Sequence, residues 1–168
     1  MKIPLSLVLS CLIFMAQSVV CATYSDIDPC SLLAPETLYA VYPEIQNLER
    51  QTIGPNTTCN YLNKYDLSAL IVSVHKDDGV SAEGVVSMLG DGYRVEKVKG
   101  LGREAAMAIT LPKPEYGIAG DLVAELYVKK GDSCLMLAPV RLNVKSVGSA
   151  FEQFKEIVLK MLESSSLP

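Results

Sequence analysis

The sequence predicts an α+β fold in which an antiparallel sheet is flanked by helices and an amphipathic helix ends the chain. Three observations lead to this fold class. Short runs of strand type are joined by turn residues, most clearly at Gly131-Asp132. A helix start is marked by Pro35, because proline is favoured at the first helical position. An apolar stripe with helical spacing runs through the end of the chain.

The first 22 residues have the features of a secretory signal peptide. Lys2 gives a basic start, an apolar stretch follows, and Val20 and Ala22 stand at the two specificity positions of a cleavage site. The pattern favours cleavage after Ala22, which makes residues 23–168 a periplasmic or secreted protein. Two alternatives stay open. The apolar stretch approaches the roughly 18 residues of a membrane anchor, and Cys21 offers a lipid attachment site like that of a bacterial lipoprotein.

The mature chain has the size of one globular domain and an acidic charge. Removing the first 22 of 168 residues leaves 146, and the loss of Lys2 changes the formal net charge from −4 to −5. We therefore expect a single domain over residues 23–168. Nucleic-acid affinity depends mainly on Lys and Arg contacts to phosphates, and the chain has no basic run. Nucleic acid is thus excluded as an expected partner.

Three cysteines follow the signal peptide, and their surroundings indicate which of them pair. Cys134 lies in an apolar, strand-like run, where a thiol packs as a small hydrophobic group. Cys30 and Cys59 both lie beside turn-forming residues. We expect a disulfide between them, which closes a loop of about 30 residues and stabilises the fold by roughly 3 to 4 kcal/mol. Zinc is the competing use of cysteine, but there is no Cys-x-x-Cys pair and only one histidine.

The first helix is expected to begin at Pro35 and to end at Pro43. Glu36 places a negative charge near the helix N-terminus, where the helix dipole favours it. Leu38 and Val41 recur at helical spacing, so that one face of the segment is apolar.

Residues 43–58 read as an irregular connection or a hairpin loop, because they contain Gly54-Pro55-Asn56 and mixed charges. A weak strand at residues 51–53 is the alternative. Structureless loops of this length are uncommon and often functional. The segment also contains a formal glycosylation sequence that begins at Asn56.

Two strands, residues 59–62 and 67–75, are predicted on either side of a hairpin turn that begins at Asn63. The second of them carries apolar residues on both faces, which is typical of a central strand. Ser81 is a suitable cap for a short helix. Residues 93–98 then alternate as a half-exposed strand.

Three further strands are predicted, at residues 105–111, 122–129 and 133–142. The last two form a hairpin around Gly131-Asp132. Proline cannot donate to a strand ladder, so Pro139 indicates that the final strand lies at an edge or carries a bulge there.

The final helix is the clearest element. Ser149 and Glu152 match a capping box. Burial of the apolar stripe contributes roughly 10 kcal/mol or more before entropy is subtracted. The residues of the stripe are Ala150, Phe151, Phe154, Ile157, Val158, Met161 and Leu162.

The sequence predicts no enzyme, no cofactor and no metal site. His75 with Asp77 and Asp78 is the only acid/base candidate, because histidine titrates near neutral pH. No nucleophile signature accompanies it, and a solvated turn after a strand explains the same residues. Gly100-Leu101-Gly102 lacks the following helix that a dinucleotide site needs.

Several short motifs resemble a family of small bacterial envelope proteins of unknown function, many of them lipoproteins, which open with D-P-C-x-L-L. They are Asp28-Pro29-Cys30-Ser31-Leu32-Leu33, the step Cys59-Asn60-Tyr61, and the run of residues 98–105 ahead of a hairpin. The resemblance covers most of the mature chain and implies a PsbP-like α/β/α sandwich, a fold used mainly for binding other proteins. This chain departs from the pattern at Ala34, where Thr or Ser usually caps the first helix, and in its poor lipid-attachment site.

We therefore expect an exported, non-catalytic binding or scaffold protein of the bacterial envelope that acts on another envelope or secreted protein. One alternative is an inhibitor or immunity protein against an envelope-acting toxin or hydrolase. Another is a periplasmic small-ligand carrier or hydrolase. The oligomeric state stays open. The candidate interaction residues lie in the loops 43–58 and 112–121 and are Glu44, Arg50, Tyr116 and Asp121.

Overall fold

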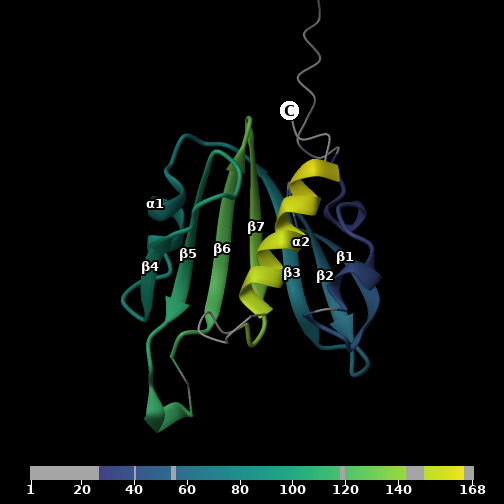
Figure 1. Cartoon of the computed structure of the whole chain (residues 1–168), viewed down its shortest axis with the longest axis horizontal. Helices are drawn as coiled ribbons and strands as arrows, with labels where there is room; N and C mark the ends of the chain where they lie inside the picture. Colours follow the sequence, from purple (N-terminus) through teal and green to yellow (C-terminus); the bar gives the residue numbers. More distant parts are fainter. Residues whose placement is uncertain (1–26, 40, 54–55, 118–119, 143–149, 165–168) are drawn as a thin grey trace, which may run out of the picture.

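The computed structural model of the protein describes residues 27–39, 41–53, 56–117, 120–142 and 150–164. Its centre is a seven-stranded, antiparallel, open sheet with the strand order β1-β2-β3-β7-β6-β5-β4 (Figure 1). The predicted α+β class with an antiparallel sheet is confirmed. The strands are β1 (Ile45–Ile53), β2 (Asn56–Asn63), β3 (Ser68–Lys76), β4 (Tyr93–Lys97), β5 (Glu104–Thr110), β6 (Val123–Lys130) and β7 (Ser133–Pro139).

Two α-helices pack on the sheet. α2 (Ala150–Ser164) crosses β3 and β7 in Figure 1, and its buried stripe belongs to the larger of two hydrophobic clusters. α1 (Ala82–Ser87) packs against β4, β5 and β6 and belongs to the smaller cluster. Neighbouring residues of β5 alternate between the clusters, with Ala105 in the larger one and Ala106 in the smaller one. Successive side chains of a strand point to opposite faces, so the helices cover opposite faces.

The predicted stripe of the final helix is confirmed. Phe154, Val158 and Met161 are fully buried, and Phe151, Ile157 and Leu162 are nearly so. Lys130 of β6 donates a hydrogen bond to the Leu162 carbonyl, which satisfies one backbone acceptor near the end of α2. Ser149, the predicted cap, lies outside the described residues.

The N-terminal segment is held on the α2 side of the sheet by the predicted disulfide. Cys30 and Cys59 are bonded, with their Cα atoms 5.0 Å apart. Cys134 is a free, buried thiol, as predicted. The Asp28 carboxylate accepts a hydrogen bond from the Cys30 amide at 3.0 Å and thereby caps the first turn, η2 (Pro29–Ser31).

The predicted helix from Pro35 to Pro43 is wrong. The structure has only the 3₁₀ turn η3 (Pro35–Leu38), and no side chain caps it, because its N-cap residue is Ala34. A segment this short cannot form a stable helix by itself. The conformation of this segment is fixed by packing instead, since Leu38 is fully buried in the larger cluster while Tyr39 stays exposed.

The predicted loop at residues 43–58 is wrong, because β1 and the start of β2 occupy most of it as a hairpin. The alternative, a strand at residues 51–53, is confirmed, and the strand extends back to Ile45. β1 is an edge strand, and its residues 46–52 are exposed. A strand without a buried face needs no alternation of apolar and polar residues. Pairing with β2 therefore forms an element for which the sequence has almost no pattern.

The other strand predictions hold, with one correction. β3 is central, and the predicted strands at 93–98 and 105–111 are β4 and β5. β7 lies inside the sheet rather than at its edge. Pro139 is tolerated there because it is the last residue of the strand, after which the Val140 amide donates to the Ala69 carbonyl at 2.8 Å.

Candidate functional site

A groove of about 500 Å³ lies at one end of the sheet. At this end β1 begins, the β2–β3 hairpin turns and β7 ends. The segment before β1, residues 41–44, forms one wall, and the hairpin forms another. The remaining lining residues are Ile45, Ser68, Ala69, Val140 and Arg141.

The rim of the groove exposes large apolar side chains. Tyr65 is 67% exposed, Leu67 is 62% exposed, and Val140, which follows β7, is also exposed. Burying one such side chain against a partner gains roughly 1.5 to 3 kcal/mol. Neighbouring exposed apolar residues of this kind are typical of an interaction site.

Local backbone chemistry holds the hairpin in place. The Asn63 side chain accepts hydrogen bonds from the amides of Tyr65 at 2.9 Å and Leu67 at 3.1 Å. Asp66 adopts the left-handed conformation with φ of 57°, which Asp tolerates better than most residues. The ammonium group of Lys64 lies 4.9 Å from the centre of the Tyr65 ring. The hairpin therefore presents Tyr65 and Leu67 from a defined turn.

The wall formed by residues 41–44 contains a half-buried tyrosine, Tyr42, whose hydroxyl is fully buried. Burial raises the pKa of Tyr42, and its hydroxyl has no hydrogen-bond partner within the part of the chain that the structure describes. Arg141, which also lines the groove, has a left-handed φ of 59° and an exposed side chain. Arg141 therefore places a charged group beside the apolar rim, whereas the Tyr42 hydroxyl is closed to solvent.

The four predicted interaction residues fall at different places. Glu44 lines the groove. Tyr116 is exposed in the turn η4 (Pro114–Tyr116), and Asp121 pairs with Arg94 at 3.2 Å. Both belong to the β5–β6 connection, which projects at the same end of the sheet as the β2–β3 hairpin (Figure 1). Arg50 lies within β1 and pairs with Asp28 at 3.3 Å, so it is not part of this end.

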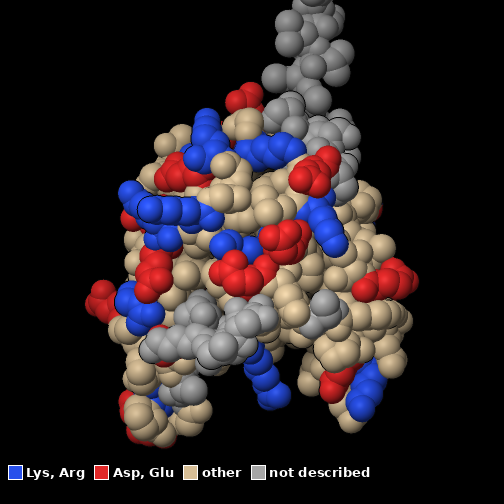
Figure 2. Space-filling model, viewed as in Figure 1, with Lys and Arg blue, Asp and Glu red and all other residues tan. Residues whose placement is uncertain are grey.

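The charges of the α2 side are mixed. Figure 2 shows lysine and arginine interspersed with aspartate and glutamate on this face, with no large area of one sign. The same view shows two lobes at the bottom with a hollow between them. Contacts made at this end would therefore depend more on shape and apolar surface than on a single-sign field.

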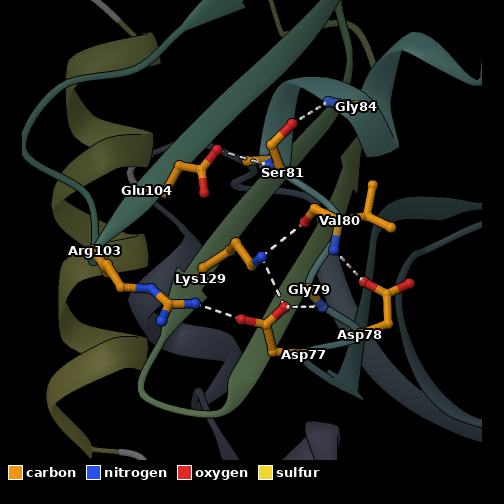
Figure 3. Close-up of polar contacts among 10 residues, drawn as sticks. Asp77, Asp78, Gly79, Val80, Ser81, Gly84, Arg103, Glu104 and Lys129 are labelled. Carbon is orange, nitrogen blue, oxygen red and sulfur yellow. Dashed lines mark hydrogen bonds and ion pairs between the residues drawn. The ribbon is translucent and has the colours of Figure 1, made fainter.

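A second polar cluster lies at the opposite end of the sheet, between β3 and α1 (Figure 3). Lys129 is only 3% exposed, and its ammonium group lies 2.7 Å from Asp77 Oδ1 and 2.7 Å from the Val80 carbonyl oxygen. Arg103 donates a second hydrogen bond to Asp77, and the Gly79 amide donates a third at 2.9 Å. Asp77 thus ties β6 to the segment that leads into α1.

This cluster is fully paired and acts as a structural clamp. The hydrogen bond from Lys129 is the main reason that the pKa of Asp77 falls to about 2, so the carboxylate stays charged. Glu104 accepts a hydrogen bond from the Ala82 amide at 2.9 Å and caps α1 together with Ser81. Every group in the cluster therefore has a partner within the fold.

His75 does not join this cluster. Its Nε2 lies 3.0 Å from the hydroxyl oxygen of Ser73, and burial lowers the pKa of the imidazole. Ser73 is fully buried, so its hydroxyl is closed to substrate. Over the described ranges His75 has no hydrogen bond or ion pair with Asp77 or Asp78. The structure therefore does not bring the candidate acid/base residues together by a side-chain hydrogen bond or ion pair.

The sequence reasoning missed the apolar rim of the groove. The signal was present in Asn63-Lys64-Tyr65-Asp66-Leu67, where two large apolar residues lie in or beside a turn that is otherwise polar. Val140 and Arg141 gave no signal, because only the pairing of β3 with β7 brings them to the hairpin.

No protein-family model, curated protein or solved structure matches this chain. Within the described residues, no group of three or more His, Cys, Asp or Glu side chains could hold a metal ion. None of the described helices is long and apolar enough to cross a membrane.

Proposed function

We propose that this protein is an exported, non-catalytic binding module of the bacterial envelope, and that the groove at the end of the sheet holds part of another envelope or secreted protein. The observation that carries the proposal is the set of exposed apolar residues Tyr65, Leu67 and Val140, which line one groove of about 500 Å³. Aromatic anchors that enter pockets are typical of protein interfaces. The sequence supports export through its signal peptide.

The family resemblance gives this proposal its setting. A sheet with one helix on each face agrees with the PsbP-like α/β/α sandwich that D-P-C-x-L-L implies. We propose that the chain belongs to that group of small envelope proteins. The mature protein would then be either free after cleavage at Ala22 or anchored by lipid at Cys21, and intact mass distinguishes the two forms.

Site-specific photo-cross-linking tests the groove directly. A photoreactive phenylalanine analogue is placed at position 67 or at position 140, in cells that produce the whole protein. We expect both positions to give an adduct with the same partner, because both line the groove. Leu67→Glu should abolish the adduct at position 140, since it places a charge in the apolar rim.

The matched control is position 88. Met88 is as exposed as any large apolar residue of the described chain, but it lies at the end of α1 and outside the groove. The photoreactive group at position 88 should not capture the same partner. No adduct at positions 67 and 140, or the same adduct at all three positions, would contradict the proposal.

A small-ligand carrier is the second candidate, and the size of the groove favours it. Pockets for small molecules usually measure roughly 300 to 1,000 Å³. Native mass spectrometry of protein purified from its host would then show a bound compound that Leu67→Glu removes. A protein adduct at positions 67 and 140 together with a ligand-free mass would instead favour the binding module.

A further inference from the structure

The two edges of the sheet differ in their protection against pairing. β4 has five residues, of which Arg94, Glu96 and Lys97 are charged, and α1 packs against it. The turns η2 and η3 likewise contact β1, so the two edges differ in length and charge rather than in cover. Short, charged edges resist the addition of a second strand. β1 has nine residues, including neither lysine nor proline, and residues 46–52 are exposed along its length. β1 is therefore the edge that is open to pairing.

We propose that β1 pairs with β1 of a second copy of this chain, in an antiparallel register centred on Leu48. The two sheets then continue across a two-fold axis perpendicular to them. The proposal uses the sheet edge and does not depend on the groove or on the function proposed for it. Leu48 is 37% exposed at the middle of this edge, which places an apolar side chain where the two copies meet.

The charges of β1 select this register. If the two-fold axis passes through residue n, residue i of one copy pairs with residue 2n − i of the other. Like charges that face each other directly destabilise a pair of strands. An axis at Glu49 opposes two carboxylates, and an axis at Arg50 opposes two guanidinium groups. An axis at Leu48 opposes no like charges and pairs residues 45–51. It is the longest register with that property.

The same register gives Glu49 a partner. The Glu49 side chain has no hydrogen bond or ion pair among the described residues, whereas the neighbouring Arg50 pairs with Asp28. With the axis at Leu48, Glu49 of each copy faces Asn47 of the other, and an asparagine amide can donate to a carboxylate. The two Leu48 side chains meet on the face that also carries Tyr61, because Leu48 pairs with Tyr61.

The dimer would make the protein bivalent. Each groove lies at the end of the sheet where β1 begins. A two-fold axis perpendicular to the sheet reverses the strand direction, so the two grooves would lie at opposite ends of the continuous sheet. Two linked sites bind a repeated or clustered partner more tightly than one site does.

Sedimentation velocity over a range of protein concentrations tests the dimer, with the Cys30–Cys59 disulfide intact. We expect the protein to shift from monomer to dimer as its concentration rises. Leu48→Lys should leave only monomer, because it opposes two ammonium groups at the axis, and Met88→Lys should dimerise like the unchanged protein. A monomer at every concentration up to the millimolar range would overturn the proposal, as would a dimer that Leu48→Lys leaves intact.

Cysteine cross-linking tests the register. Under mild oxidation Leu48→Cys should form a disulfide-linked dimer in high yield, because the two copies of this residue face each other. Glu49→Cys and Gln51→Cys should form far less, and peptide mapping identifies the bond. A linked dimer that forms mainly at position 49 or 51 would overturn the register, and equal, low yields at all three positions would overturn the β1 contact itself.

Discussion

Glu125 is a carboxylate that the fold holds half-buried in β6. Across the strands it faces Ala108 of β5, a side chain that cannot hydrogen-bond. Within the described ranges the Glu125 side chain has no hydrogen bond or ion pair, and burial raises its pKa above the ordinary value of 4.5. The charge at neutral pH therefore costs stability, because desolvation disfavours the ionised form.

Glu125→Gln should stabilise the protein at neutral pH. The folded pKa is raised, so the stability that protonated Glu125 contributes is fully present below pH 4.5 and is lost as the pH rises through the folded value. Because the side chain is partly exposed, the gain should stay below about 1 kcal/mol. Urea unfolding at pH 7 and at pH 4 measures it. The gain should appear at pH 7 and disappear at pH 4, and an equal effect at both values would contradict this explanation.

Single residues differ in how well the sequence predicts their environment. The Cys30–Cys59 pair could be predicted, because the third cysteine lies in an apolar strand. The buried Lys129 could not, since in Val128-Lys129-Lys130 it looks like any surface lysine at the end of a strand. Its partner Asp77 is distant in the chain, and only the sheet brings the two together.

At the scale of elements, the N-terminal segment is the one whose attachment is covalent. Its turns are too short to be stable alone, and Leu32, Leu33 and Leu38 fix them by burial in the larger cluster. The disulfide adds to this burial by joining Cys30 to β2. In the unfolded chain the same bond closes a loop with a sequence separation of 29, which removes conformational entropy.

Replacing both cysteines by alanine should lower the free energy of unfolding by roughly 3 to 4 kcal/mol and leave the sheet intact. Urea unfolding compares the variant with the oxidised protein, and near-ultraviolet circular dichroism reports whether the core is retained. Addition of dithiothreitol is the control, because it should lower the stability of the unchanged protein and not that of the variant. A variant as stable as the oxidised protein would show that the bond adds nothing beyond the packing of Leu38.

Elements that carry their own pattern could be predicted, and those fixed by neighbours could not. The stripe of α2, the apolar residues on both faces of β3 and the turn at Gly131-Asp132 are local signals, and each is confirmed. β1 has no such signal because its residues 46–52 stay exposed on both faces. The groove is still harder to predict, since its walls come from segments that are far apart in the chain.

At the scale of the whole molecule, the two faces of the sheet are unequally supported. The larger cluster joins α2 and the N-terminal segment to six of the seven strands. The smaller one consists mainly of alanines and other small side chains beneath α1. Since stability differs across a structure according to local burial, α1 should open separately, while loss of α2 should open the whole fold.

Phe154→Ala and Val86→Ala test this difference, because both side chains are fully buried and they lie on opposite faces. Phe154→Ala should lower the free energy of global unfolding by about 3 to 5 kcal/mol, since it leaves a cavity between α2 and the sheet. Native-state hydrogen exchange should then show faster exchange in β3 and β7. Val86→Ala should accelerate exchange in α1 and leave β3 and β7 nearly unchanged, because the clamp formed by Lys129 and Asp77 still holds the loop before α1. Faster exchange of β3 in Val86→Ala, to the extent seen in Phe154→Ala, would show instead that the two faces unfold as one cooperative unit.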